Sequence, residues 1–156
     1  MPVTAHPARA ARKTRELFTI GYEGRAPLDL VKALVAAKVE VLLDVRERAQ
    51  SRKPGFSKSA LAEALTRAGV VYEHVPELGS PRALRVAGRE TGDFVTFMKG
   101  YRKHLDGQAE HLDRVAQLVT TRRVCLLCFE RESTMCHRSE VASRLGGALC
   151  LPITNL

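Results

Sequence analysis

The sequence has few cysteines and no long apolar run, and each shortage excludes a class of protein. Four cysteines in 156 residues are too few for a disulfide scaffold, and three of them stand in or beside apolar stretches, as in a reduced intracellular protein. No apolar segment reaches the roughly twenty residues that a membrane-spanning helix needs. Internal repeats and low-complexity segments are also absent. We therefore expect a cytoplasmic protein that does not span a membrane.

The first sixteen residues lack the apolar core of a secretory signal and carry several Arg and Lys side chains instead. We expect residues 1–16 to form a disordered basic arm. Residues 17–156 are expected to form a single α/β domain, which is long enough to bury a core of its own. Two interpretations of the arm stay open: a loose solvated terminus, or a contact with nucleic acid.

Basic residues outnumber acidic ones over the whole chain. There are 25 Lys and Arg against 17 Asp and Glu, which gives a net charge of +8. This excess favours an anionic partner such as a nucleotide or nucleic acid, although part of it lies in the arm. The composition does not indicate an oligomeric state or a cofactor.

Short apolar runs alternate with segments of helical periodicity. The expected strands are residues 17–20, 39–45, 70–75, 124–129 and 148–153. Helical patterns occupy most of the intervening chain, but residues 76–90 show none and are expected to be a long connection such as a lid or a binding loop. Strand–helix alternation predicts a three-layer α/β fold with a mainly parallel five-stranded sheet and helices on both faces. The strand order does not follow from these patterns.

The stretch from residue 124 to residue 145 carries the densest set of reactive side chains. A buried strand leads into a polar loop, and Ser133 or Thr134 can cap a helix that ends at Gly146. In open α/β sheets, ligands bind where a strand's carboxyl end meets a helix's amino end, because free N–H groups and the helix dipole favour anions there. Side chains alternate along a strand, so Cys128 and Glu130 are expected to point the same way.

Polar side chains stand at the ends of several expected strands. The candidate catalytic residues are Glu130, Asp44, Cys128 and His137. The candidate ligand-binding residues are Tyr22, Arg46, Arg52, Glu77, Cys136 and Arg138. Because parallel strands bring their carboxyl ends together, Arg46, Glu130 and Arg138 are expected in one cleft. Our first hypothesis is a pocket for a phosphate-bearing ligand, where arginines hold the anion and a carboxylate or imidazole is the acid–base group of a hydrolase or transferase.

Further basic residues stand close to these candidates. They are Arg48 and Lys53 after the second strand, and Arg82, Arg85 and Arg89 in the connection 76–90. Such clusters repel themselves unless an anion is present, although an open loop can also leave its charges in solvent.

Three other functions are consistent with the same residues. Cys128 or Cys136 could be a nucleophile that His137, Arg138 and the helix amino terminus activate. The same three side chains could hold zinc, but Cys125 and Cys128 face opposite ways on a strand, so a closed four-ligand site is hard to assemble and we assign no metal ligands. The basic arm could serve a non-catalytic nucleic-acid adaptor.

A purely structural explanation competes with each functional one. Buried cysteines often act only as small hydrophobic groups. Arg138 can simply pair with Glu130. Asp44 and Arg46 can form a structural ion pair, because a charge at the end of a buried strand is costly unless it is satisfied.

Five separated segments resemble successive motifs of one protein family. They are Phe18-Thr-Ile-Gly-Tyr22, Leu43-Asp-Val-Arg46, Ser51-Arg-Lys-Pro-Gly-Phe56, Tyr72-Glu-His-Val-Pro-Glu-Leu-Gly79, and Cys128-Phe-Glu130 with Cys136-His-Arg-Ser139. In this order they are similar to the domain of unknown function 488 (DUF488) family over nearly all of the chain after the arm. The family has no settled activity, so the resemblance implies the domain rather than the reaction. Many members carry a His after the first glycine, where this sequence has Tyr22.

A looser similarity connects the chain to sulfurtransferases and cysteine phosphatases. The segment Leu42–Arg46 resembles a rhodanese strand, and Cys128 followed by Arg138 resembles the cysteine loop of those enzymes. Their loops place the arginine closer to the cysteine and bind an anion with successive backbone N–H groups. The longer gap in this sequence does not imply that geometry.

Overall fold

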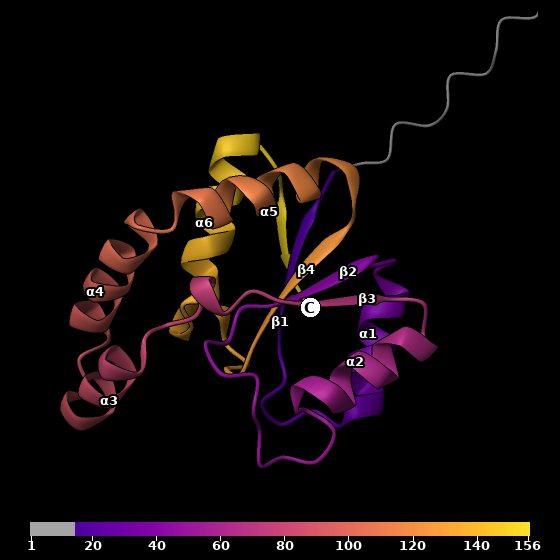
Figure 1. The fold of residues 1–156 in the computed structure, drawn as a ribbon, viewed down its shortest axis with the longest axis horizontal. Helices are drawn as coiled ribbons and strands as arrows, with labels where there is room; N and C mark the ends of the chain where they lie inside the picture. The colour runs from indigo at the N-terminus through magenta and orange to yellow at the C-terminus, as the bar shows by residue number, and fades with distance from the viewer. Residues whose placement is uncertain (1–14) are drawn as a thin grey trace, which may run out of the picture.

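The computed structural model describes residues 15–156 and contains a five-stranded parallel sheet (Figure 1). Its strands are β1 (Leu17–Gly21), β2 (Val41–Asp44), β3 (Val71–His74), β4 (Val124–Cys128) and β5 (Ile153–Asn155). They lie in the order β3-β2-β4-β1-β5, and every neighbouring pair is parallel. The expected strands 17–20, 39–45, 70–75 and 124–129 are confirmed, with ends that differ by at most two residues.

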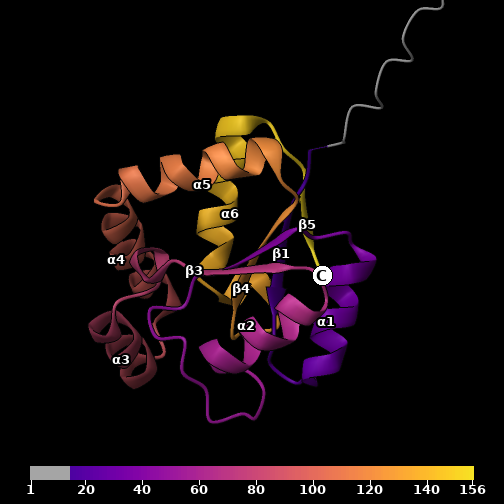
Figure 2. The same cartoon turned by 45° about the vertical axis from the view of Figure 1, so that its right-hand side comes forward.

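Helices cover both faces of the sheet, which confirms the predicted three-layer α/β fold (Figure 2). On one face lie α1 (Pro27–Ala36) and α2 (Lys58–Arg67). On the other lie α4 (Phe94–Asp106), α5 (Ala109–Thr121) and α6 (Arg138–Leu149). A further helix, α3 (Arg82–Thr91), packs beside α4, and the short 3-10 helices η1 (Pro76–Leu78) and η2 (Ser133–Met135) precede α3 and α6.

The burial of the central strand β4 explains why its sequence is a continuous apolar run. Val124, Leu126 and Cys128 belong to the core under α4, α5 and α6, whereas Cys125 and Leu127 belong to the core under α1 and α2. All five side chains are buried because a parallel strand in the middle of a covered sheet has no solvent face. The period-two alternation therefore places Cys125 and Cys128 in different cores.

Helix α3 corrects the expectation that residues 76–90 form a long connection without regular structure. The helix has no fully buried residue, although one of its faces is apolar and packs beside α4. It is anchored by Leu84, whose side chain lies over Gly100 of α4 where a Cβ would stand only 2.6 Å away. Gly92 ends the helix in the left-handed conformation, with φ 66°.

The carboxyl-terminal expectations were also wrong in part. Helix α6 does not stop at Gly146 but continues to Leu149, and Cys150 takes the left-handed conformation with φ 52°. The last strand is therefore Ile153–Asn155 rather than residues 148–153. Gly146 is needed for close packing instead, because a Cβ there would stand 2.9 Å from Ile153. The strand lies at the sheet edge, directly after Pro152.

The start of α6 also differs from the expected capping by Ser133 or Thr134. Both residues lie in η2, and α6 begins three residues later with His137 as its cap residue. Most of the predicted basic arm, residues 1–14, lies outside the described residues. Glu16 already stands beside β1, where its carboxylate pairs with Arg123 at 3.6 Å. Within residues 15–156, no helix combines the length and the apolar composition of a membrane span.

Candidate functional site

A pocket of about 660 Å³ opens where β1, β2 and β4 end. Tyr22 directly follows β1, Arg46 stands two residues after β2, and Cys128 is the last residue of β4. The strand order makes this possible, because β4 lies between β2 and β1. The remaining lining comes from the segments after β2 and β4 and from the region of η1, α3 and α4: Glu47, Arg48, Gln50, Ser80, Arg85, Gly88, Arg89, Gly92, Phe94, Phe97, Phe129, Glu130, Met135 and His137.

The guanidinium group of Arg46 forms a two-point ion pair with Asp44 beside the pocket. The Nε–Oδ1 distance is 2.8 Å and the Nη2–Oδ2 distance is 2.6 Å. Nη1 donates to the Tyr22 hydroxyl at 3.2 Å and to the Phe56 carbonyl at 2.9 Å. Burial alone would lower the pKa of Arg46, but the hydrogen bonds and charge of Asp44 outweigh it and raise the pKa. Arg46 thus faces the pocket with most of its donors already used.

Asp44 is fully buried and does not line the pocket. Besides Arg46, it accepts a hydrogen bond of 2.5 Å from the Tyr72 hydroxyl. Burial, followed by this hydrogen bond, raises the pKa of Tyr72. The carboxylate is therefore enclosed by partners within the sheet, which is the arrangement that the structural explanation of this pair predicts.

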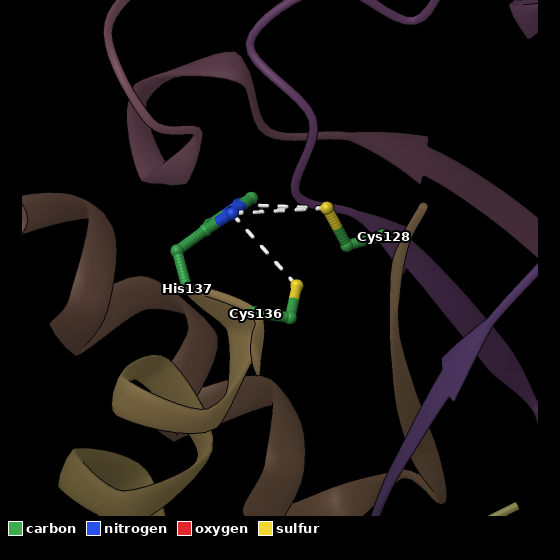
Figure 3. Close-up of side chains that lie close together, drawn as sticks. All are labelled: Cys128, Cys136 and His137. Atoms are coloured by element: carbon green, nitrogen blue, oxygen red, sulfur yellow. Dashed lines mark hydrogen bonds between the residues drawn. The ribbon is translucent and has the colours of Figure 1, made fainter. Parts of the chain in front are cut away.

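Cys128, Cys136 and His137 form a buried cluster (Figure 3), and two of them, Cys128 and His137, also line the pocket. His137 Nδ1 lies 3.7 Å from Cys128 Sγ and 3.9 Å from Cys136 Sγ. The other ring nitrogen, Nε2, lies 2.9 Å from the carbonyl oxygen of Val45. The ring edge also packs on Tyr101, with centroids 5.0 Å apart and planes at 71°. The imidazole is therefore held on two sides, with both sulfurs near it.

Burial shapes the ionisation of this cluster. It raises the pKa of Cys136 well above its ordinary value, and the neighbouring Cys128 adds to the shift. Burial alone would lower the pKa of His137, but Cys136 and the Val45 carbonyl outweigh it and raise the pKa. An activated nucleophile needs a lowered thiol pKa, so the shift on Cys136 does not favour the cysteine-enzyme hypothesis, which stays a prediction.

Arg138 does not line the pocket, and its guanidinium group instead donates to backbone carbonyls of the loop after β4. Its side chain is 1% exposed. Nη1 donates to the Glu130 carbonyl, and Nη2 donates to the Arg131 carbonyl at 3.2 Å. Glu130 and Arg46 do share the pocket. Of the three residues expected in one cleft, the structure therefore brings two into the lining and places the third beneath it.

The remaining predicted binding residues lie outside the lining. Arg52 and Glu77 do not contribute to it, and neither does Cys136. Instead, the lining includes Arg48 and the α3 residues Arg85 and Arg89, which the sequence marked only as nearby basic groups. Sequence reasoning does not identify Phe94 and Phe97 of α4 as pocket residues, because their helical spacing is that of core residues. No pattern in the sequence distinguishes a half-buried core ring from one that also borders a pocket.

The fold and the site define an α/β protein with a basic and aromatic pocket at the carboxyl edge of a parallel sheet. The family model described as "Domain of unknown function DUF488" matches residues 28–145. This match spans most of the chain, so the protein belongs to the DUF488 family. No curated protein and no solved structure matches the chain significantly.

Proposed function

We propose that the pocket binds a phosphate-bearing ligand with a flat ring, such as a nucleotide or the end of a nucleic acid. The charged residues of the lining are Arg46, Glu47, Arg48, Arg85, Arg89 and Glu130. Two of the arginines already have carboxylate partners. Arg46 is held by Asp44, and Arg85 pairs with Glu47 at 2.7 Å. The arginines without such partners support the proposal most directly.

Arg48 and Arg89 are exposed and face the same cavity. Within residues 15–156, Arg48 has no hydrogen bond or ion pair, and Arg89 has only a long contact of 3.4 Å from Nε to the Arg85 carbonyl. Two cations beside one cavity repel each other, and a bound anion removes that repulsion while accepting charge-assisted hydrogen bonds. This pair of uncommitted guanidinium groups is the observation that carries the proposal.

Aromatic rings supply a surface for the flat part of the ligand. Phe129 is 44% exposed, and its ring meets Tyr22 edge-on, with centroids 5.3 Å apart. Phe94 and Phe97 border the same cavity from α4. Aromatic side chains beside arginines are typical of sites that stack nucleic-acid bases and neutralise phosphates.

We propose Glu130 as the acid–base group of a hydrolase or transferase reaction in this pocket. Its side chain lines the cavity, and Oε2 is buried without a hydrogen-bond partner among the described residues. Buried carboxylate oxygens are normally satisfied, so an unsatisfied one beside a cavity is suited to a substrate hydroxyl or a water molecule. His137 also lines the cavity, but its ring nitrogens lie near protein atoms, Nε2 at the Val45 carbonyl and Nδ1 at the two sulfurs, so Glu130 is the better candidate.

Calorimetric titration of the full chain at low salt, with ATP, GMP and a short single-stranded oligonucleotide as probes, tests the binding. Arg48→Ala and Arg89→Ala should each weaken binding about tenfold or more, because a hydrogen bond to a charged group contributes about 1.5–3 kcal/mol. Arg52→Ala is the matched control, since it removes the same charge from the same loop but lies outside the lining. In a parallel titration at about 0.15 M salt, the affinity of Arg52→Ala should stay within about twofold of the wild type, because the solvent then screens exposed charges over about 8 Å.

Two results would contradict the proposal. Absence of binding by the wild-type chain at low salt would remove it. An equal loss from Arg52→Ala would show diffuse attraction to a basic surface instead of a pocket. Deleting residues 1–16 distinguishes binding in the pocket from the adaptor hypothesis. Binding in the pocket survives this truncation, whereas an adaptor loses its affinity together with its steep salt dependence.

A further inference from the structure

We infer that Cys128, Cys136 and His137 form a three-ligand zinc site whose fourth coordination position faces the pocket. The ligands come from the last residue of β4 and from the two residues directly before α6. Their donor atoms lie within 4.8 Å of one another, and all three residues are buried (Figure 3). The inference concerns the metal alone and does not depend on which ligand the pocket binds.

The distances between the donor atoms are close to those of a tetrahedral zinc site. Zn–S bonds of about 2.3 Å and Zn–N bonds of about 2.0 Å put sulfur and nitrogen ligands about 3.5 Å apart. In the structure, Nδ1 of His137 lies 3.7 Å and 3.9 Å from the sulfurs of Cys128 and Cys136. These two distances exceed the tetrahedral separation by only a few tenths of an ångström. Cys128 Sγ is also 3.7 Å from Nε2, so metal binding requires the thiol to rotate toward Nδ1.

The hydrogen bond of the other ring nitrogen selects the correct tautomer of His137. A carbonyl oxygen only accepts, so the 2.9 Å contact with Val45 requires the proton on Nε2. Nδ1 is then left unprotonated, and both sulfurs lie within 3.9 Å of it. Metal-binding histidines nearly always donate their second N–H to a carbonyl or carboxylate in this way. Tyr101 holds the ring in place from the side, and its hydroxyl donates to the Leu78 carbonyl at 2.5 Å.

Among residues 15–156, no fourth His, Cys, Asp or Glu side chain joins this cluster, which leaves one coordination position open. Cys125 lies in the core on the other face of the sheet, so the sequence pair Cys125-x-x-Cys128 does not converge. Cys128 and His137 line the pocket, whereas Cys136 does not. Two cysteines and one histidine with a free position are a ligand set of catalytic zinc sites, in which water or substrate completes the coordination.

Zinc also balances the charge of this buried cluster. Binding converts the two thiols into thiolates and releases two protons to solvent, so the dication and the thiolates together carry no net charge. Soft thiolate ligands with an imidazole suit zinc better than magnesium or calcium, which prefer oxygen ligands. A single zinc ion therefore accounts for the burial of two thiols beside a histidine.

Metal analysis of the full chain, purified without chelator, tests the inference and should find about one zinc per chain. Substitution with Co²⁺ should give intense tetrahedral bands in the visible spectrum and a sulfur-to-cobalt charge-transfer band. Azide, a small anion that binds open positions, should shift the visible bands. Cys128→Ser, Cys136→Ser and His137→Ala should each weaken zinc binding by more than about 100-fold, since even changes behind the ligands cost roughly 10–100-fold.

Cys150→Ser is the matched control, because Cys150 is an exposed free thiol outside the cluster, and its zinc content should equal that of the wild type. Circular dichroism shows whether each variant is folded. If another variant unfolds, the zinc content of Cys128→Ser, the smallest change at the pocket surface, is the deciding measurement. Absence of zinc and of Co²⁺ charge-transfer bands in the wild type would overturn the inference. So would full zinc content in folded Cys128→Ser, or a mass lower by two hydrogen atoms that reveals a Cys128–Cys136 disulfide. A cobalt spectrum that azide does not change would overturn the open position.

Discussion

Replacing Asp44 with alanine is expected to lower the free energy of unfolding by about 3–5 kcal/mol. The carboxylate is fully buried, and Arg46 is only 6% exposed. Without Asp44, the guanidinium keeps its contacts with the Tyr22 hydroxyl and the Phe56 carbonyl but loses both charge-neutralising bonds. Removing one member of a buried pair leaves the other charge uncompensated, which is why the expected loss exceeds that for a surface ion pair.

Chemical denaturation followed by circular dichroism measures this loss. Tyr72→Phe is the control, because it removes only the hydroxyl that donates to Asp44 at 2.5 Å and leaves the ion pair in place. It should cost about 0.5–1.5 kcal/mol if the remaining partners still satisfy the carboxylate. If Asp44→Ala costs no more than Tyr72→Phe, the ion pair with Arg46 does not hold the sheet end together.

Replacing Gly21 with alanine should also lower the free energy of unfolding, by about 3 kcal/mol or more. A Cβ at this last residue of β1 would stand 1.8 Å from the Glu130 carbonyl oxygen and 2.5 Å from its carbon. Both atoms belong to the backbone, so no side-chain rotation relieves the contact. The loop after β4 must move instead, and the hydrogen bond from Arg138 to the same carbonyl must change with it.

Gly147→Ala is the matched control for Gly21→Ala. Gly147 lies in α6, and a Cβ there meets no atom within 4 Å. Alanine is better than glycine inside a helix by roughly 0.5–1 kcal/mol, so this variant should be as stable as the wild type or slightly more stable. Thermal melts of both variants decide the matter. Equal melting temperatures would show that the contact between β1 and the loop after β4 does not constrain the site.

The two variants also probe the pocket from different directions. Asp44→Ala acts on the network that holds Arg46 and Tyr22 at the ends of β2 and β1. Gly21→Ala acts on the loop that carries Glu130. A pocket between three strand ends depends on both supports, so each change should weaken nucleotide binding as well as stability.

Much of the fold could be predicted from local patterns. The run Val124–Cys128 is too short and too apolar for a surface helix, and the structure confirms it as a central strand. Helix α3 was missed because it lies outside the strand–helix alternation and packs beside another helix, α4, through contacts such as Leu84 with Gly100 and Gly88 with Phe97. The missed end of α6 has a similar cause: Gly146 serves close packing against Ile153, which sequence reasoning cannot distinguish from a left-handed helix stop.

The sequence by itself determined the strand–helix alternation, the facing of Cys125 and Cys128 into opposite cores, and the polar residues at strand ends, because these depend on local periodicity. The tertiary structure decided which of those residues meet. Placing β4 between β2 and β1 brings Arg46 and Glu130 into one pocket. Successive helical residues point in different directions, so His137 reaches the cysteines while Arg138 turns to backbone carbonyls. The strand order that brings these residues together depends on three-dimensional packing, and residue spacing does not record it.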